Sequence, residues 1–218
     1  MAALSPSPPR LLGDDDVSSS IVVTSAIEFL LERGTPFLAL PAPRATSISD
    51  TAEANGIRMD EVVRSDLMSS GIGPSLMVVP ATRSLDLGLA QKAVQDPTAR
   101  PATEEEIRSL APECDVDALP PLSLYLSAPM FVDPSVAAME QVIFPAGRRT
   151  ILVCVERTEL FGDDPAVIVD LTRESHVPGD KVSPARRAAL EGGERLLPAH
   201  LRKENDTPGQ GGRRMAGG

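Results

Sequence analysis

Apolar residues in the central part of the chain recur first at helical and then at strand spacing. Ile27 and Leu30 are three positions apart and share one face of a helix that Thr24 or Ser25 can cap. Gly34 follows the last residue of this pattern, and glycine is the residue type that most often ends a helix. A first helix is therefore expected between these caps.

Further helices are indicated by capping residues more than by long apolar faces. Ser47 or Ser49 can cap a short helix, and residues 85–93 form a second helical pattern. Thr103 and Glu106 have the spacing of a capping box, which satisfies two backbone N–H groups at the start of a helix. We therefore expect several short helices rather than a helical bundle.

Short runs rich in Val, Ile, Leu and Phe are typical of strands. Seven such runs are present, at residues 36–40, 61–68, 75–79, 129–133, 141–145, 150–155 and 166–170. The second and third are separated by a glycine-containing segment, SGIGP, that favours a hairpin. The mixed order of helices and strands predicts an α+β fold with a mixed, barrel-like curved β-sheet flanked by short helices. Strands that close on themselves would leave a pocket in the mouth of the sheet.

Residues 111–133 form a segment rich in proline, acidic and small residues. Pro120 and Pro121 each fix φ and lack a backbone donor, so this segment is expected to be neither interior helix nor central strand. A long loop in a compact domain is usually functional or disordered. Because an apolar run ending at Asp133 follows directly, we expect a functional loop that is held at both ends.

Composition divides the chain into three parts. Residues 1–18 and 173–218 are rich in Pro, Gly, Ser and charge, and we expect them to be a disordered N-terminal tail and a flexible, mildly basic C-terminal tail in which residues 183–197 have the pattern of a short helix. Residues 19–172 are expected to form one domain. Residues 17–172 carry 11 basic and 22 acidic side chains. Such an acidic body disfavours nonspecific binding to nucleic acid, DNA included.

Several classes of protein are disfavoured by residues that the chain lacks. Two cysteines, Cys114 and Cys154, are too few for a disulfide scaffold. The two histidines, His176 and His200, lie far from Cys114 in sequence, so neither Cys–His catalysis nor a zinc site is expected. No Walker or dinucleotide-binding glycine motif occurs, so no cofactor is expected. No signal peptide or membrane span is recognised, and we expect a cytoplasmic protein without a membrane partner.

The order and spacing of segments from Thr24 to Thr158 resemble the YbaK/prolyl-tRNA-editing family of aminoacyl-tRNA deacylases. The segments that carry the resemblance are IEFLLERGTPFLALPAP, TAEANGI, MDEVVRSDLM, VVPATRSLDL, ATEEEIRSLAPECDVDALPPL, PMFVD and VIFPAG. The resemblance implies a pocket under the 111–133 loop that accepts the 3′ end of a mischarged aminoacyl-tRNA and hydrolyses its ester. It also implies that an aminoacyl-tRNA synthetase is a candidate partner. In this chemistry the substrate assists the reaction, while the protein positions it and stabilises developing charge.

The resemblance places Arg64 where the family carries a lysine. A cation on a strand beside the pocket would hold the terminal phosphate or the ester carbonyl, and Arg64 is therefore a candidate catalytic residue. Arginine is a planar fork and lysine a compact point charge, so the exchange is not conservative. The alternative is a surface arginine paired with Asp66 or Glu61.

The loop keeps some positions of the family pattern and changes others. Pro120 and Pro121 match it and are candidate substrate-binding residues. Ser123, also a candidate, stands where a glycine usually follows, and Val116 and Asp117 stand where the family often has a Pro-Gly pair. Side chains at these positions add bulk to the pocket wall. They indicate either altered substrate choice or a site that has lost activity.

Two further candidates come from the resemblance. Asp133 matches an acidic residue that would bind the substrate amine, and the alternative is the N-cap of a helix that begins at Pro134. Gly147 matches a turn glycine near the pocket. Arg148 and Arg149 beside it form the densest basic point of the domain, and a solvated turn is the alternative to a contact with RNA there.

Two functions of different classes remain open. The first is a trans-editing aminoacyl-tRNA deacylase, a hydrolase that serves translation fidelity. The second is a catalytically impaired protein of the same fold that acts as a binding or regulatory module.

Overall fold

The computed structural model describes residues 23–162, 166–173 and 195–196. The helices are α1 (Ser25–Glu32), α2 (Ile48–Ala54), the 3-10 helix η1 (Met59–Glu61), α3 (Leu87–Val94), α4 (Glu104–Leu110), α5 (Ser123–Leu126), α6 (Pro134–Ala137) and α7 (Arg157–Phe161). The strands are β1 (Phe37–Pro41), β2 (Val63–Ser70), β3 (Gly73–Pro80), β4 (Arg100–Pro101), β5 (Met130–Val132), β6 (Gln141–Pro145), β7 (Ile151–Glu156), β8 (Ala166–Ile168) and β9 (Arg195–Leu196).

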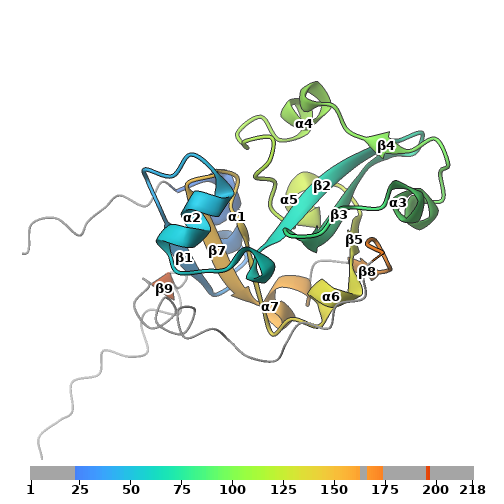
Figure 1. Ribbon diagram of the computed structural model, residues 1–218. Coiled ribbons are helices and arrows are strands. Elements are labelled where there is room, and N and C mark those ends of the chain that lie inside the picture. The colour runs from blue at the N-terminus through green and yellow to red at the C-terminus, as the bar shows by residue number, and fades with distance from the viewer. Residues whose placement is uncertain (1–22, 163–165, 174–194, 197–218) are drawn as a thin grey trace, which may run out of the picture.

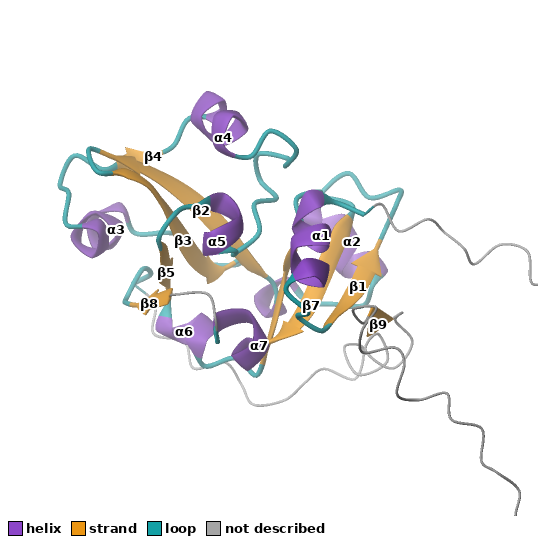
Figure 2. Cartoon of the chain, turned by 180° about the vertical axis from the view of Figure 1, so that it is seen from behind, coloured by secondary structure: helices purple, strands orange, loops and turns teal. Residues whose placement is uncertain are grey.

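The strands form two sheets that lie next to each other (Figures 1 and 2). One has the order β6-β7-β1-β9 and is antiparallel throughout. The other has the order β4-β2-β3-β5-β8, with parallel pairing of β3 with β5 and of β5 with β8. The prediction of an α+β fold with a mixed sheet is confirmed.

The strands do not close on themselves in the described part of the chain. The expected closed mouth does not form, because the chain passes from one sheet to the other between β1 and β2, between β5 and β6 and again between β7 and β8. A parallel bridge between Val62 and Ile143 joins the two sheets where they meet. The domain is therefore two open sheets in contact rather than one barrel.

The main hydrophobic core fills the space between the sheets and is covered by α1. Buried side chains of β1 and β7 share this cluster with Val63 and Leu67 of β2 and with Ile27 of α1. The opposite faces of the sheets have smaller clusters, one under α2 and one under α3. The sheet of β6, β7 and β1 is thus buried on both faces, which explains why these strands are almost continuously apolar.

The predicted helix caps are present. The Thr24 side chain accepts a hydrogen bond from a backbone N–H at the start of α1. Ser47 forms a capping box with Asp50 at α2, and Thr103 forms one with Glu106 at α4. These local signals were sufficient because each cap is completed within three residues of sequence.

The helices that the sequence did not predict are all short. η1 has three residues, α5 four and α7 five, while α6, which begins at Pro134 as the alternative interpretation of Asp133 expected, has four. A helix of this length makes little more than one turn, so its apolar residues show no period. As a result the segment 111–133, expected to be a loop up to its final strand, also contains α5.

The predicted tails fall almost wholly outside the described residues. The same is true of the helix expected over residues 183–197. Only its end is described, and there β9 pairs antiparallel with β1. Arg173, at the start of the predicted C-terminal tail, forms an ion pair with Asp86.

The Asp133 carboxylate, which follows β5, bonds to the start of α6 and to the chain after β8. It is 3% exposed and caps α6 by accepting a hydrogen bond from the backbone N–H of Ser135 at 3.0 Å. Its other oxygen accepts hydrogen bonds from the N–H groups of Leu171 and Thr172, at 3.2 and 3.1 Å. Burial raises the pKa of Asp133, but these hydrogen bonds outweigh it and the pKa lies below its ordinary value.

Replacing Asp133 with asparagine should destabilise the fold by about 2–4 kcal/mol at neutral pH, because an amide cannot accept all of these bonds from buried donors. The lowered pKa means that this stabilisation is complete above the pKa of the unfolded chain and is lost as the pH falls through the folded value. Urea unfolding of both proteins between pH 7 and pH 3 should therefore show a difference that shrinks below about pH 4. Asp60→Asn, at a side chain that is 44% exposed, is the control. A difference between Asp133→Asn and the parent that is equal at both ends of this range would contradict the assignment.

Gly147 connects the loop before α5 to the turn between β6 and β7. Its φ is +85°, and its N–H donates to the carbonyl oxygen of Ala118 at 3.0 Å while its own carbonyl accepts from Asp115 N–H at 2.8 Å. A Cβ at this position would lie 3.2 Å from the Sγ of Cys114. Both the positive φ and this close contact require glycine.

Gly147→Ala should lower the free energy of unfolding by about 1–3 kcal/mol, because it combines a left-handed φ with a contact to a buried thiol. Thermal or urea unfolding measures the change. Gly71→Ala is the matched control, since its new methyl group would meet only the Asp96 carboxylate at an ordinary 3.5 Å. Equal stability of the two variants would show that the turn tolerates a side chain.

Candidate active site

A cavity of about 410 Å³ lies beside β2. Its lining comes from β2, from the segment between β3 and α3, and from the chain between β4 and the loop before α5. The lining residues are Arg64, Ser65, Asp66, Leu67, Met68, Ser84, Leu85, Leu87, Pro101, Ala102, Ile107, Val116, Asp117 and Leu119. Most of them are apolar, and the three charged ones are Arg64, Asp66 and Asp117. A mainly apolar cavity with a few polar groups is typical of a site for a small organic group.

The cavity exists because one edge of β2 is largely uncovered. β3 pairs with all eight residues of β2, whereas β4 pairs only with Met68 and Ser69 on the other side. Leu67 accepts a hydrogen bond from Ala102 N–H at 2.8 Å, so its carbonyl points away from β3. The backbone direction repeats every second residue, and the N–H and C=O groups of Ser65 therefore also face the uncovered edge.

Arg64 and Asp66 lie on the same face of β2. Arg64 Nη2 and Asp66 Oδ2 are 3.0 Å apart, and the two side chains are 37% and 33% exposed. Burial raises the pKa of Asp66, and the charge of Arg64 only partly opposes this. Both sequence interpretations of Arg64 therefore apply, because it lines the cavity and also has Asp66 as its partner.

Two buried polar atoms in this wall have no hydrogen-bond partner among the described residues. They are Nε of Arg64 and Oγ of Ser65, and Ser65 is 7% exposed. Buried polar atoms are seldom left unpaired in a folded protein without a functional reason. Ser65 was not predicted as a site residue, and Asp66 was expected only as a surface partner of Arg64, because neither residue type carries a signal for an uncovered strand edge.

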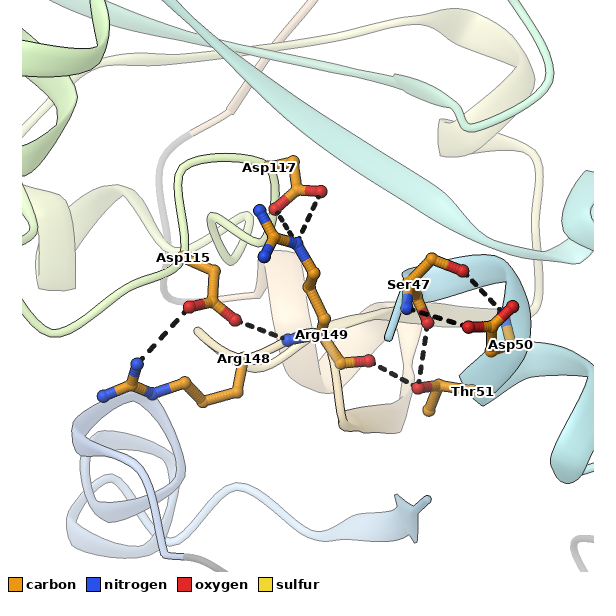
Figure 3. Close-up of polar contacts among 7 residues, drawn as sticks. All are labelled: Ser47, Asp50, Thr51, Asp115, Asp117, Arg148 and Arg149. Atoms are coloured by element: carbon orange, nitrogen blue, oxygen red, sulfur yellow. Dashed lines mark hydrogen bonds and ion pairs between the residues drawn. The ribbon is translucent and has the colours of Figure 1, made fainter. Parts of the chain in front are cut away.

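The wall opposite β2 is held in place by two aspartates (Figure 3). Asp115 accepts from the backbone N–H of Arg149 at 2.9 Å and lies 3.4 Å from Arg148 Nη1. Asp117, which lines the cavity, accepts from Arg149 Nε with both oxygens at 2.7 and 2.9 Å. The basic turn that the sequence offered as a contact for RNA is thus engaged with the protein's own loop.

The same turn is tied to α2 from its other side. The Thr51 hydroxyl donates to the carbonyl oxygens of Arg149 and of Ser47, the N-cap of α2 (Figure 3). Because Arg149 also binds Asp117, the position of the cavity wall depends on α2 as well as on the loop. The wall is a supported structure and not a freely moving lid.

Of the residues predicted to form the site, Arg64 lines the cavity and the others do not. Pro120, Pro121 and Ser123 are buried in the chain that follows the lining residue Leu119. Gly147 does not line the cavity, but its N–H bonds to Ala118, which lies between the lining residues Asp117 and Leu119, whereas Asp133 lies at the start of α6. The structure thus brings one predicted residue together with Ser65, Asp66 and Asp117, and it confirms the alternative role of Asp133 as the N-cap of α6.

Cys114 has the properties of an inert thiol. Burial raises its pKa, and its Sγ lies 3.8 Å from the hydroxyl of Tyr125. A nucleophilic cysteine needs the opposite, a lowered pKa and an exposed thiolate.

Metal-binding residues do not gather in the described ranges. No three His, Cys, Asp or Glu side chains there are close enough to hold an ion. Within the same residues, no helix has both the length and the apolar character needed to cross a membrane.

Comparison with solved structures finds the same fold in several proteins. A candidate trans-editing enzyme for prolyl-tRNA synthetase is 26% identical, with a TM-score of 0.60 over 68% of this chain and 96% of that one. A protein described as hypothetical is 22% identical, with a TM-score of 0.60 over 66% and 97%. A candidate signal transduction protein from Marinobacter aquaeolei VT8 is 17% identical, with a TM-score of 0.52 over 68% and 30%. The last two show the fold alone.

Comparison with curated proteins finds no significant match. The sequence model of the aminoacyl-tRNA editing domain, in contrast, matches residues 42–161. This range contains β2, the cavity and the loop that closes it. The chain therefore belongs to the aminoacyl-tRNA editing domain family, as its resemblance to the YbaK-like deacylases predicted.

Proposed function

We propose that this protein is a trans-editing deacylase that hydrolyses the ester of a mischarged aminoacyl-tRNA in the cavity beside β2. The observation that carries the proposal is Arg64, a cation that lines a mainly apolar cavity in an editing domain. The apolar walls would enclose the amino-acid side chain, and the charged wall would face the ester and the terminal ribose. The proposed partner is the 3′ end of the tRNA, with a synthetase as a further candidate.

The reaction requires that water attack the ester carbonyl carbon and that the C–O bond to the terminal ribose then break. One proton of the water goes to the leaving ribose oxygen and the other is released to solvent, so the amino acid leaves as a carboxylate. Negative charge develops on the carbonyl oxygen in the transition state, and a fixed cation and N–H groups stabilise it best. Arg64 and the outward-facing N–H of Ser65 are the groups of this wall that can do so, while a hydroxyl of the tRNA would take part in moving the proton.

An enclosed ester also explains how such a site would select its substrate. A cavity of about 410 Å³ must hold the aminoacyl group and part of the terminal nucleoside. Larger side chains would then be excluded by size, whereas smaller ones would enter. Val116 and Asp117, which the resemblance places at the pocket wall, both line this cavity and reduce its room.

A second function, binding without catalysis, is favoured by one observation. The guanidinium of Arg64 is already engaged by Asp66, so part of its charge is neutralised before any substrate enters. A binding or regulatory module would need the cavity but not a strong electrostatic contribution to a transition state.

A panel of mischarged tRNAs separates the two functions. We expect ester hydrolysis on at least one pair, and Arg64→Ala should lower kcat/KM by roughly 10²-fold, as is typical when one group that stabilises an oxyanion is lost. Arg64→Lys should retain more activity, because it keeps the charge but not the fork. Arg58→Ala, at an exposed arginine that pairs with Asp60 just before β2, is the matched control and should act as the parent does.

Absence of turnover on every pair by a folded protein would refute the enzymatic function and leave binding. Turnover that is unchanged in Arg64→Ala would leave an enzyme in which Arg64 has no part in the reaction.

A further inference from the structure

The cavity contains two carboxylates, and their surroundings differ. Asp117 is 53% exposed and has both oxygens engaged by Arg149 Nε. Asp66 is 33% exposed and meets Arg64 through Oδ2. Its other oxygen has no partner within the described part of the chain. Asp66 is therefore the carboxylate of this cavity that retains a free acceptor.

The position of Asp66 makes that acceptor a strong one. Burial raises the pKa of its carboxyl, which shows that the charged form has lost part of its hydration. A poorly hydrated carboxylate gains more from a cation than one in open water does. A ligand group that bears positive charge and hydrogen-bond donors would complete its shell.

The adjoining part of β2 also has polar atoms without partners. Arg64 Nε and Ser65 Oγ are buried, and neither has a partner among the described residues. These atoms lie within two residues of Asp66 on the strand that lines the cavity. Side chains alternate between the two faces of a strand, so Ser65 Oγ projects from the face opposite Asp66, and the donor next to the Asp66 carboxylate is the guanidinium of Arg64.

An aminoacyl ester has this arrangement of charge. Its α-ammonium group is one carbon atom away from the ester carbonyl, and Arg64 and Asp66 are about 7 Å apart along the strand on the same face. When the carbonyl or terminal phosphate is near Arg64, the ammonium group is within reach of Asp66. Binding of the two groups would then be simultaneous.

We propose that Asp66 binds the α-ammonium group of the aminoacyl ester and restricts the cavity to substrates whose amino group is free. This inference rests on the proposed function, since it concerns the same substrate in the same cavity. It assigns the binding of the amine to Asp66 in place of Asp133, whose carboxylate is occupied within the fold.

The remaining lining defines the amino-acid part of the substrate. Leu85, Ile107 and Leu119 offer apolar surface and no ionic partner for a charged side chain. Together with the size of the cavity, this favours aminoacyl groups with small to medium uncharged side chains.

Restriction to free amines has a consequence for other tRNA esters. A formylated or peptidyl amine is an uncharged amide, which cannot neutralise Asp66 and brings additional atoms into the same space. Entry of such a group would leave a partly buried carboxylate without its cation. Initiator and peptidyl-tRNA esters should therefore be spared.

The first test is binding, which does not depend on turnover. The probe is an adenosine whose 3′-oxygen is replaced by nitrogen, so that alanine is attached through an amide that resists hydrolysis. Titration calorimetry compares the probe with a free α-amine and its N-acetyl form. Parent protein should bind the free amine at least about 10-fold more tightly, the factor expected for a hydrogen bond to a charged group.

Variants then assign the preference to one carboxylate. Asp66→Asn keeps the shape of the side chain and should weaken binding of the free amine by about 10–100-fold while changing the acetyl form little. Asp60→Asn is the matched control and should keep the preference, because Asp60 pairs with Arg58 and does not line the cavity. Circular dichroism and thermal unfolding establish that each variant is folded, and the preference of the parent needs no variant at all.

The second test is hydrolysis of matched aminoacyl-tRNA and N-acetyl-aminoacyl-tRNA. Preference for the free amine that Asp66→Asn abolishes supports the inference. Hydrolysis of both esters at equal rates overturns it and leaves the deacylase function intact. Amine-selective binding that depends on Asp66, without hydrolysis of any ester, refutes the deacylase function and leaves the inference intact. Loss of the preference in Asp60→Asn, or its persistence in Asp66→Asn, overturns the inference.

Discussion

The pairing of β2 with β3 along its full length determines where the rest of the site lies. This hairpin commits one edge of β2 to β3 and leaves the other edge to be covered by whatever follows in the chain. β4 covers only its last part, at Met68 and Ser69. Between Arg64 and Leu67, the backbone groups on this edge have no neighbouring strand among the described residues to pair with. The loop before α5 lies opposite them. A cavity results because a strand edge and a loop meet there without a strand between them.

Electrostatics complete this arrangement. The domain has twice as many acidic as basic side chains, yet several of its acidic groups are paired within the fold (Figure 3). Asp115 and Asp117 use the basic turn at Arg148 and Arg149, so this turn holds the loop in place. The densest basic point of this acidic domain, Arg148 and Arg149, is thus used for contacts within the protein. Contact with tRNA would then have to be concentrated at the end that enters the cavity.

Local signals in the sequence predicted much of the secondary structure but not the division into sheets. Helix caps such as Thr24 and Ser47 were found because their partners are close in sequence. The split between two sheets depends on crossings of the chain, such as those between β1 and β2 and between β5 and β6, and on pairings between distant strands. The mixed, curved sheet was predicted correctly, whereas closure of its strands, for this reason, is not found in the described part of the chain.

The candidate site was predicted in part, for a similar reason. Arg64 was identified through the family pattern, and the structure places it in the cavity. Ser65 and Asp66 became candidates only when the uncovered edge of β2 was known, since their residue types are common on any strand. Asp133 shows the opposite case, because the sequence allowed two roles and hydrogen bonds in the fold use its carboxylate for one of them.

The turn at residues 146–149 allows substitutions outside the cavity to change its shape during evolution. The Thr24 hydroxyl at the start of α1, the Thr51 hydroxyl of α2 and the loop before α5 all bond to this turn, and Arg149 carries their positions to Asp117. A substitution in either helix can therefore shift the cavity wall without altering any residue that lines the cavity. Under the proposed function, relatives with identical linings would then differ in the amino acids they accept, and comparison of lining residues alone would not reveal it.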